Sequence, residues 1–118
     1  MKLILQTLIF LMAWKFAYAS EKYNLVYVEQ QGCFYCEIWD EEIAHIYPKT
    51  REGQFAPLIR LDISNYETTM DYVKPVVFTP TFILTKDSSE ISRVEGYIGD
   101  DLFWGMLEVM LKRETSYK

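Results

Sequence analysis

The spacing of hydrophobic positions changes several times along the chain, and each change marks a predicted element. Residues 24–29 hold an unbroken β-prone run from Leu25 to Val28, which predicts a buried strand. A turn at residues 30–32 follows. From Cys33 the apolar positions recur at steps of three and four, at Cys36, Trp39, Ile43 and Ile46. This spacing predicts a helix that ends at Pro48.

The middle of the chain alternates between polar and apolar segments. Residues 49–57 are mostly polar and predict a loop, and residues 58–63 predict a second strand. The segment Ser64-Asn65-Tyr66-Glu67 has the S-x-x-E form of a capping box. It predicts a helix that runs to about Lys74 and is stopped by Pro75.

The last third predicts two strands and a helix. Residues 81–86 and 90–97 are joined by a short polar turn, which is typical of an antiparallel hairpin. Asp100 or Asp101 is the expected cap of the final helix. Its apolar face consists of Leu102, Phe103, Met106, Leu107, Met110 and Leu111. The order β-α-β-α-β-β-α predicts an α/β fold with the first two strands parallel and the last two antiparallel.

The first 19 residues have the features of a secretory signal peptide. Lys2 precedes an apolar run, and Ala17-Tyr18-Ala19 matches an A-x-A cleavage site before Ser20. The alternatives are an uncleaved anchor or a buried helix, although the run is short for a membrane span. Cleavage would leave one domain, residues 20–118, with ten basic and 17 acidic residues and a net charge of −7. Because no basic stripe is present, nucleic acid is not an expected partner.

Cys33 and Cys36 are the only cysteines of the chain, and their spacing allows three kinds of site. A structural disulfide would close a minimal loop and stabilise little. A zinc site would need about four ligands, whereas the chain offers two Cys and one His. Two thiolates can hold Cu(I), so a copper-binding or chaperone-like module is an alternative. A redox pair fits the preceding strand and the following helix, and this is the interpretation we favour.

The position of the pair at a helix start assigns a role to each cysteine. Only a thiolate attacks a disulfide, and the free N–H groups and the dipole at a helix N-terminus favour the thiolate form of Cys33. We therefore expect Cys33 to be the nucleophile. Cys36 lies one turn further, on the buried side of the helix, and would resolve the mixed disulfide by attacking Cys33.

Three motifs together resemble the thioredoxin fold in its minimal form. They are Cys33-Phe34-Tyr35-Cys36 after the first strand, Thr79-Pro80 before the third strand, and Gly96 after the fourth. The segments "GCFYC", "FTPTFIL" and "RVEGYIGDDLFWGML" look more specifically like small secreted thioredoxin-like proteins that accompany bacterial sulfur-oxidation systems. The resemblance covers nearly all of residues 20–118 and implies a four-stranded mixed sheet flanked by three helices.

The resemblance also implies a substrate-binding surface around the cysteine pair. It implies a cis peptide bond at Pro80 and a free backbone at Thr79 that pairs with an extended client segment. A trans proline that opens an edge strand is the alternative. Other residues expected to contact the client are Phe34, Tyr35, Gly96 and Tyr97. A tyrosine directly before the second cysteine, here Tyr35, resembles glutaredoxins and secreted disulfide isomerases. Gly32 stands directly before the first cysteine, where the family usually has a tryptophan. These two departures suggest a dedicated client.

Glu29 is the candidate acid–base group for the resolving step. Related proteins carry a buried acid six residues before the first cysteine, and this chain carries Tyr27 there. Glu29 lies two residues further along, so it projects to the same face of the strand. We hypothesise that it takes the proton of Cys36, directly or through water. The alternative is a solvated residue at the strand end.

The charge around the pair predicts the direction of electron flow. Residues 24–47 contain no Lys or Arg, and their acidic residues are Glu29, Glu37, Asp40, Glu41 and Glu42. Acidic neighbours oppose thiolate formation, which favours a reductant of a specific protein disulfide. A disulfide isomerase or an oxidant is the alternative. We expect a periplasmic monomer without a cofactor or bound metal, re-reduced by a membrane thiol reductase.

Overall fold

The computed structural model describes residues 21–118, in which one mixed sheet carries all the strands. In chain order the elements are β1 (Tyr23–Glu29), α2 (Phe34–Trp39), a π-helical turn (Asp40–Ala44), a 3-10 turn (Tyr47–Lys49), α3 (Arg51–Phe55), β2 (Leu58–Asp62), a second 3-10 turn (Tyr66–Thr68), β3 (Thr81–Lys86), β4 (Ser89–Glu95) and α4 (Asp100–Glu114). The strand order is β2-β1-β3-β4, with β1 parallel to β2 and both β1–β3 and β3–β4 antiparallel. The predicted fold class is confirmed.

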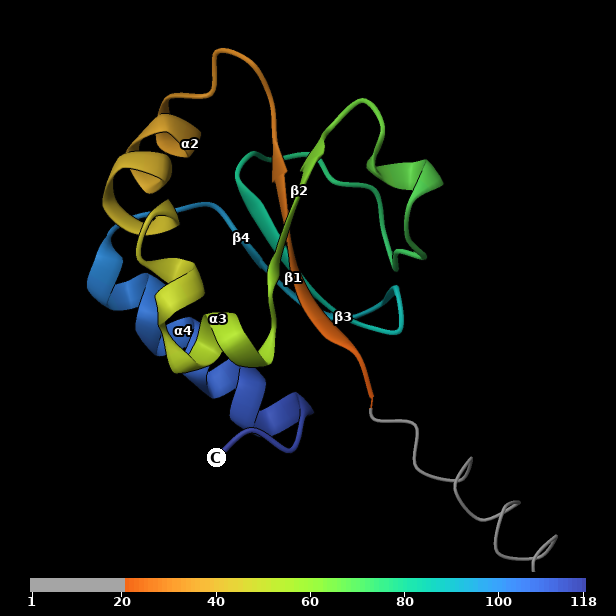
Figure 1. Ribbon diagram of the computed structural model, residues 1–118. Coiled ribbons are helices and arrows are strands. Elements are labelled where there is room, and N and C mark those ends of the chain that lie inside the picture. Colours follow the sequence, from red (N-terminus) through yellow and green to blue (C-terminus); the bar gives the residue numbers. More distant parts are fainter. Residues whose placement is uncertain (1–20) are drawn as a thin grey trace, which may run out of the picture.

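The two faces of the sheet are covered differently (Figure 1). One face packs against α2, α3 and α4, and its core includes Tyr27, Trp39, Phe82 and Phe103. The other face is covered by the irregular segment 63–80. Its buried residues are Val26, Val28, Tyr66, Met70, Val76 and Ile83. The alternation of β1 side chains between the faces explains its unbroken apolar run, because both faces are covered.

The predicted loop at residues 49–57 is wrong, because it contains α3. The Thr50 hydroxyl accepts the N–H of Gly53 at 3.0 Å and caps this short helix. Gly53 is buried against the preceding turn, where an added Cβ would lie 1.8 Å from the carbonyl oxygen of Tyr47. The helix therefore depends on a cap and a tight backbone contact rather than on an apolar stripe, which is why its sequence resembled a loop.

The helix predicted over residues 64–74 is also wrong, since only the 3-10 turn Tyr66–Thr68 forms there. The Ser64 side chain donates to the Asp62 carboxylate at 2.7 Å instead of capping a helix. The turn itself has no side-chain cap. Two adjacent β-branched residues, Thr68 and Thr69, further weaken helix formation. All three helices consequently lie on the other face of the sheet.

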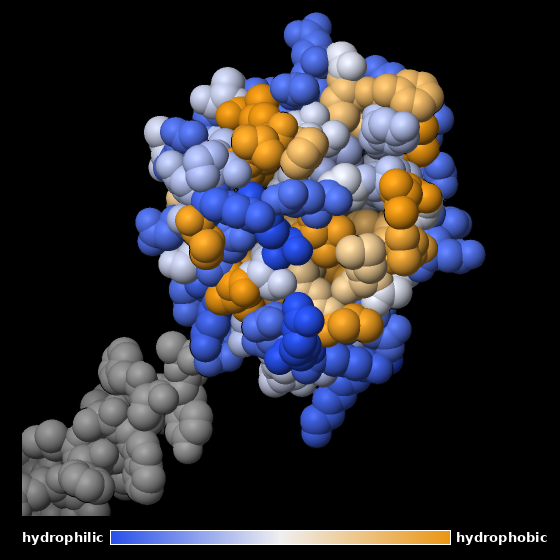
Figure 2. Space-filling model, turned by 180° about the vertical axis from the view of Figure 1, so that it is seen from behind, coloured by the Kyte–Doolittle hydropathy of each residue, from blue (hydrophilic) through white to orange (hydrophobic). Residues whose placement is uncertain are grey.

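Smaller differences concern the helix ends and faces. The π-helical turn widens the helix after Trp39, so Tyr47 takes the next buried position and Ile46 is exposed. The N-cap of α4 is Gly99 rather than Asp100 or Asp101. On α4, Leu102 and Met106 are exposed because β4 is an edge strand, and they line a groove between α4 and β4. Figure 2 shows this side, where apolar surface borders a hollow.

Residues 21–118 contain no helix with the length and apolar character that a membrane span requires. The signal peptide predicted at residues 1–19 lies outside the described residues.

Candidate functional site: a disulfide at the start of a helix

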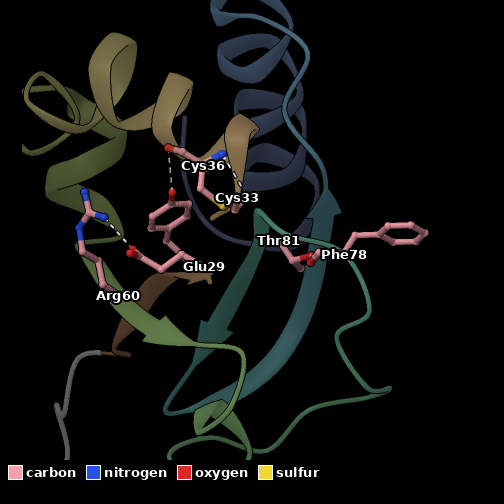
Figure 3. The surroundings of a disulfide bond; sticks show 7 residues. Glu29, Cys33, Cys36, Arg60, Phe78 and Thr81 are labelled. Carbon is pink, nitrogen blue, oxygen red and sulfur yellow. Dashed lines mark hydrogen bonds and ion pairs between the residues drawn. A yellow bond between two sulfur atoms is a disulfide. The ribbon is translucent and has the colours of Figure 1, made fainter. Parts of the chain in front are cut away.

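The two cysteines form a disulfide at the N-terminus of α2 (Figure 3). Gly32 adopts a φ of +80° in the preceding turn, a conformation that glycine accommodates best. Cys33 is the N-cap residue, and its Sγ accepts the N–H of Cys36 at 3.1 Å. Both cysteines are largely buried. A sulfur that accepts a backbone N–H at a helix start is placed to be stabilised as a thiolate.

Tyr27 lies directly beneath the pair, at the position where related proteins carry an acid. Its hydroxyl donates to the carbonyl oxygen of Cys36 at 3.2 Å, and its ring packs against Trp39 and Phe82. Burial, followed by the nearby carboxylates of Asp40 and Glu29, raises the pKa of Tyr27. The phenol therefore keeps its proton at neutral pH and acts as a hydrogen-bond donor.

Arg60 of β2 neutralises two of the acidic residues near the pair. Figure 3 shows its guanidinium directed at the Glu29 carboxylate. The guanidinium forms ion pairs of 2.7 Å with Glu29 and 2.5 Å with Asp40. The same group lies 5.0 Å from the ring centre of Tyr27 and 6.0 Å from that of Trp39. The sequence argument from uncompensated acidic charge is therefore weakened, because a cation from a distant strand joins the cluster.

Glu29 lies two residues after Tyr27 on β1 and so on the same face of the strand, and its carboxylate is paired with Arg60, which also lies over the ring of Tyr27. Its side chain is one-third exposed, so water reaches it. Its role in proton transfer stays a prediction. Of the remaining acids, Glu42 accepts the hydroxyl of Tyr97 at 3.2 Å, and Glu37 and Glu41 are exposed.

A shallow groove runs beside the disulfide. It is lined by Tyr35, Phe78, Thr79, Glu95, Gly96, Tyr97 and Ile98. Phe34, Tyr35, Phe78 and Ile98 are exposed apolar residues, and Ile98 is 81% exposed. Figure 3 shows Phe78 on the opposite side of the site from Glu29, with its ring directed outward. An apolar border of this kind suits an extended peptide with apolar side chains.

The loops that form the groove are joined by backbone contacts. The Thr79–Pro80 peptide bond is cis. The N–H of Gly96, whose φ is +88°, donates to the carbonyl oxygen of Pro80 at 2.7 Å. Tyr97 lines the groove yet is only 4% exposed, and its burial with the Glu42 contact raises its pKa to about 12. Of the residues predicted to bind the client, Tyr35, Thr79, Gly96 and Tyr97 line this groove, whereas Phe34 is exposed outside its lining and Pro80 is buried.

Three residues of this region were not singled out from the sequence: Arg60, Phe78 and Ile98. Phe78 and Ile98 each lie next to a predicted site residue in the sequence. An apolar residue in a predicted loop could have indicated that each contributes to the binding surface. Arg60 is the one cation within the predicted strand 58–63, but nothing in the sequence shows its partners. Among residues 21–118, no group of three or more His, Cys, Asp or Glu side chains is arranged to hold a metal ion.

Comparison with known proteins identifies the family. A family model described as a thioredoxin-like domain matches residues 12–111. The periplasmic thioredoxin SoxS from Paracoccus pantotrophus, in its reduced form, is 43% identical, with a TM-score of 0.75. That match covers 78% of this chain and 98% of SoxS. No curated protein sequence shows significant similarity to the chain.

More distant structures share the fold. A thioredoxin-fold protein from Helicobacter pylori is 17% identical with a TM-score of 0.55, and the match covers 82% of this chain and 74% of that one. A thioredoxin from Thermus thermophilus is 18% identical with a TM-score of 0.53, covering 77% and 75% respectively. The family model, the SoxS match and the Cys33–Cys36 pair together show that this chain belongs to the thioredoxin-like family and is a thiol–disulfide oxidoreductase.

Proposed function

We propose that the chain is a periplasmic oxidoreductase that reduces a specific protein disulfide. The observation that carries the proposal is the Cys33–Cys36 disulfide at the start of α2, beside an exposed apolar groove. Similarity to a periplasmic thioredoxin supports the compartment, as does the signal peptide predicted at residues 1–19. The sequence resemblance to thioredoxin-like proteins of sulfur-oxidation systems suggests a client from that chemistry.

The reaction proceeds through two thiol–disulfide exchanges. The Cys33 thiolate attacks one sulfur of the client disulfide, which forms a mixed disulfide and releases the other client sulfur as a thiolate. Cys36 then attacks Cys33, so the Cys33–Cys36 bond forms and the second client sulfur leaves. The client gains two electrons and takes up protons to become a dithiol, while the cysteine pair is oxidised.

Glu29 serves as the acid–base group of the second exchange. It accepts the Cys36 proton, directly or through water, because a thiol must lose its proton before it attacks. The Arg60 guanidinium lies 2.7 Å from the Glu29 carboxylate and holds it at the end of β1. Glu29→Gln should slow resolution of the mixed disulfide and alter its pH profile. An unchanged rate across pH would exclude this role.

Client binding is assigned to the groove and the residues on its border. Thr79 offers backbone groups to an extended client segment beside Pro80, and Phe34, Tyr35, Gly96 and Tyr97 contact its side chains. The apolar border of the groove supports this assignment. A membrane thiol reductase returns the Cys33–Cys36 pair to the dithiol state by exchange, so the reaction needs no bound cofactor.

The reduction potential of the Cys33–Cys36 couple tests the direction of electron flow. Equilibration in defined thiol buffers should give a value near that of thioredoxin, about −270 mV. A value near that of a strong oxidant, about −120 mV, would contradict the proposal and support disulfide formation or isomerisation.

A trapping experiment tests the assignment of the two cysteines. Cys36→Ser should accumulate a mixed disulfide with the client through Cys33, because the resolving thiol is missing. Cys33→Ser is the matched control and should trap nothing. Stoichiometric tight binding of Cu(I) by the reduced protein, together with no trapping, would instead support the copper-binding alternative.

A further inference from the structure

The segment between β2 and β3 covers one face of the sheet almost without regular structure. Between residues 63 and 80, the only helical element is the 3-10 turn Tyr66–Thr68. Backbone groups outside helices and strands need other partners when they are buried. In this segment, side chains of β4 and of the turn supply several of those partners.

The main contact is a buried ion pair on β4. The side chains of Glu90 and Arg93 are 5% and 8% exposed, and the guanidinium contacts both carboxylate oxygens at 2.6 Å. Each partner also holds a backbone group of the covering segment. The Glu90 carboxylate accepts the N–H of Val73 at 2.9 Å, and Arg93 donates to the carbonyl oxygen of Lys74 at 2.7 Å. Bidentate pairs of this kind fix geometry strongly.

Further contacts hold the chain on both sides of the client groove. The N–H of Val76 donates to the hydroxyl of Tyr66 at 2.8 Å. Beyond the groove, the Thr81 hydroxyl donates to the carbonyl oxygen of Phe78 at 2.7 Å (Figure 3). Between these points Val77 and Phe78 are exposed, with exposed fractions of 69% and 59%. Core packing therefore contributes little to the position of this stretch.

We infer that Glu90 and Arg93 are positioning residues that fix the Phe78–Thr79 wall of the client groove through the backbone of Val73 and Lys74. The inference rests on the proposed function, since it assigns recognition of a protein client to this wall. If the wall is already held in place, binding of the client loses less conformational entropy in that loop, and the affinity is higher. Loss of the ion pair should consequently weaken binding of a protein disulfide and leave the chemistry at Cys33 unchanged.

The test compares a protein disulfide with a small one. The double variant Glu90→Leu/Arg93→Met removes both backbone contacts and replaces the pair with apolar side chains of similar size, a change that buried pairs often tolerate. The control, Glu108→Gln/Lys112→Met, removes an exposed ion pair on α4. Reduction of insulin and of 5,5′-dithiobis(2-nitrobenzoate) is measured for each reduced protein, together with the reduction potential.

For the double variant, we expect the KM for insulin to rise about tenfold, with kcat changed less than about twofold. The rate with the small disulfide and the potential should match those of the wild type and the control. An unchanged KM for insulin, or equal losses with both substrates, would overturn the inference. If the wild type reduces neither substrate, the proposed function itself fails.

A milder variant covers the case in which the double variant does not fold. Tyr66→Phe removes only the hydroxyl that accepts the N–H of Val76. It should raise the KM for insulin by about threefold, with a normal rate toward the small disulfide. An unchanged KM would contradict a groove wall that is fixed by the contacts of this segment, and hydrogen exchange at Val73, whose N–H is bonded to Glu90, reports whether the segment has loosened.

Discussion

Tyr27 occupies the place of the buried acid of related proteins, and Tyr27→Phe tests what the hydroxyl does there. The substitution removes one hydrogen bond of 3.2 Å and leaves the ring packing with Trp39 and Phe82 intact. The carbonyl oxygen of Cys36 keeps a second donor, the N–H of Asp40. Because no buried group loses its only partner, we expect the free energy of unfolding to fall by about 1 kcal/mol.

The same substitution should have a small effect on catalysis. The raised pKa of Tyr27 keeps the phenol protonated, so it cannot accept the proton of Cys36. A loss of about 1 kcal/mol corresponds to at most about a fivefold change in the rate of resolution. Loss of a true general base would cost about 10²-fold to 10⁴-fold. On the same scale, the reduction potential should shift by less than about 30 mV.

Guanidinium unfolding of the oxidised and reduced proteins measures the stability change, and stopped-flow mixing measures resolution of a preformed mixed disulfide. Tyr23→Phe is the matched control. Tyr23 lies on the same strand as Tyr27, and the substitution removes a hydroxyl that donates to the Glu21 carboxylate at 2.7 Å. A hundredfold slower resolution in Tyr27→Phe, with normal kinetics in Tyr23→Phe, would refute the assignment of Tyr27 as a donor only. Tyr27 would then take over the role proposed for Glu29.

Four further predictions concern stability. Gly53→Ala should lower the free energy of unfolding by about 2 kcal/mol or more, since its Cβ would meet the Tyr47 carbonyl oxygen at 1.8 Å. Gly105→Ala in α4, where the Cβ would meet nothing within 4 Å, should raise the free energy of unfolding by about 0.5–1 kcal/mol. The same change in unfolding free energy for the two variants, measured by chemical denaturation, would contradict both predictions. Arg60→Met should cost about 1–2 kcal/mol at low salt and less at 1 M salt, so a salt-independent loss would argue against ion pairing. Burial opposes ionisation of Glu90, but hydrogen bonds from Arg93 and Val73 outweigh it and hold its pKa below the ordinary 4.5. The ionised carboxylate therefore stabilises the fold above pH 4.5, and this contribution to the free energy of unfolding should be lost as the solution is acidified through the lowered pKa. Glu90→Gln should flatten this acid limb, and a parallel pH profile would contradict the reasoning.

The sequence was sufficient for elements that depend on local patterns. β1 and β3 are buried on both faces, so their apolar runs identified them. The C-x-x-C motif predicted a cysteine pair because its spacing is local, and the two cysteines form a disulfide. Thr79-Pro80 was selected by the resemblance to the thioredoxin fold, and its peptide bond is cis. The helix predicted from the S-x-x-E motif failed because the backbone N–H and the hydroxyl of Ser64 both donate to the Asp62 carboxylate, which holds Ser64 in the turn after β2 and away from an N-cap position. A capping motif cannot reveal such competition from a neighbouring residue.

The charge around the disulfide depends on contacts between distant residues and could not be obtained from the sequence. Arg60 lies 31 positions after Glu29, yet the parallel pairing of β1 and β2 brings the two side chains together. The same applies to Glu90, whose partner on the chain segment before the groove is the backbone of Val73. Backbone partners leave no trace in a sequence pattern, whereas an apolar stripe does.

The outer edge of β4 is protected along its length, which bears on self-association. At its start, Asp71 forms a parallel bridge to Ser89, and a bulge interrupts the β3–β4 register between Leu84 and Thr85. At its end, Glu95 carries a charge that pairs with Lys74 at 3.3 Å. A covered start, a kink and a charged end all hinder a second copy from adding a strand. The edge that borders the client groove is thus shielded from the sheet extension that leads to aggregation.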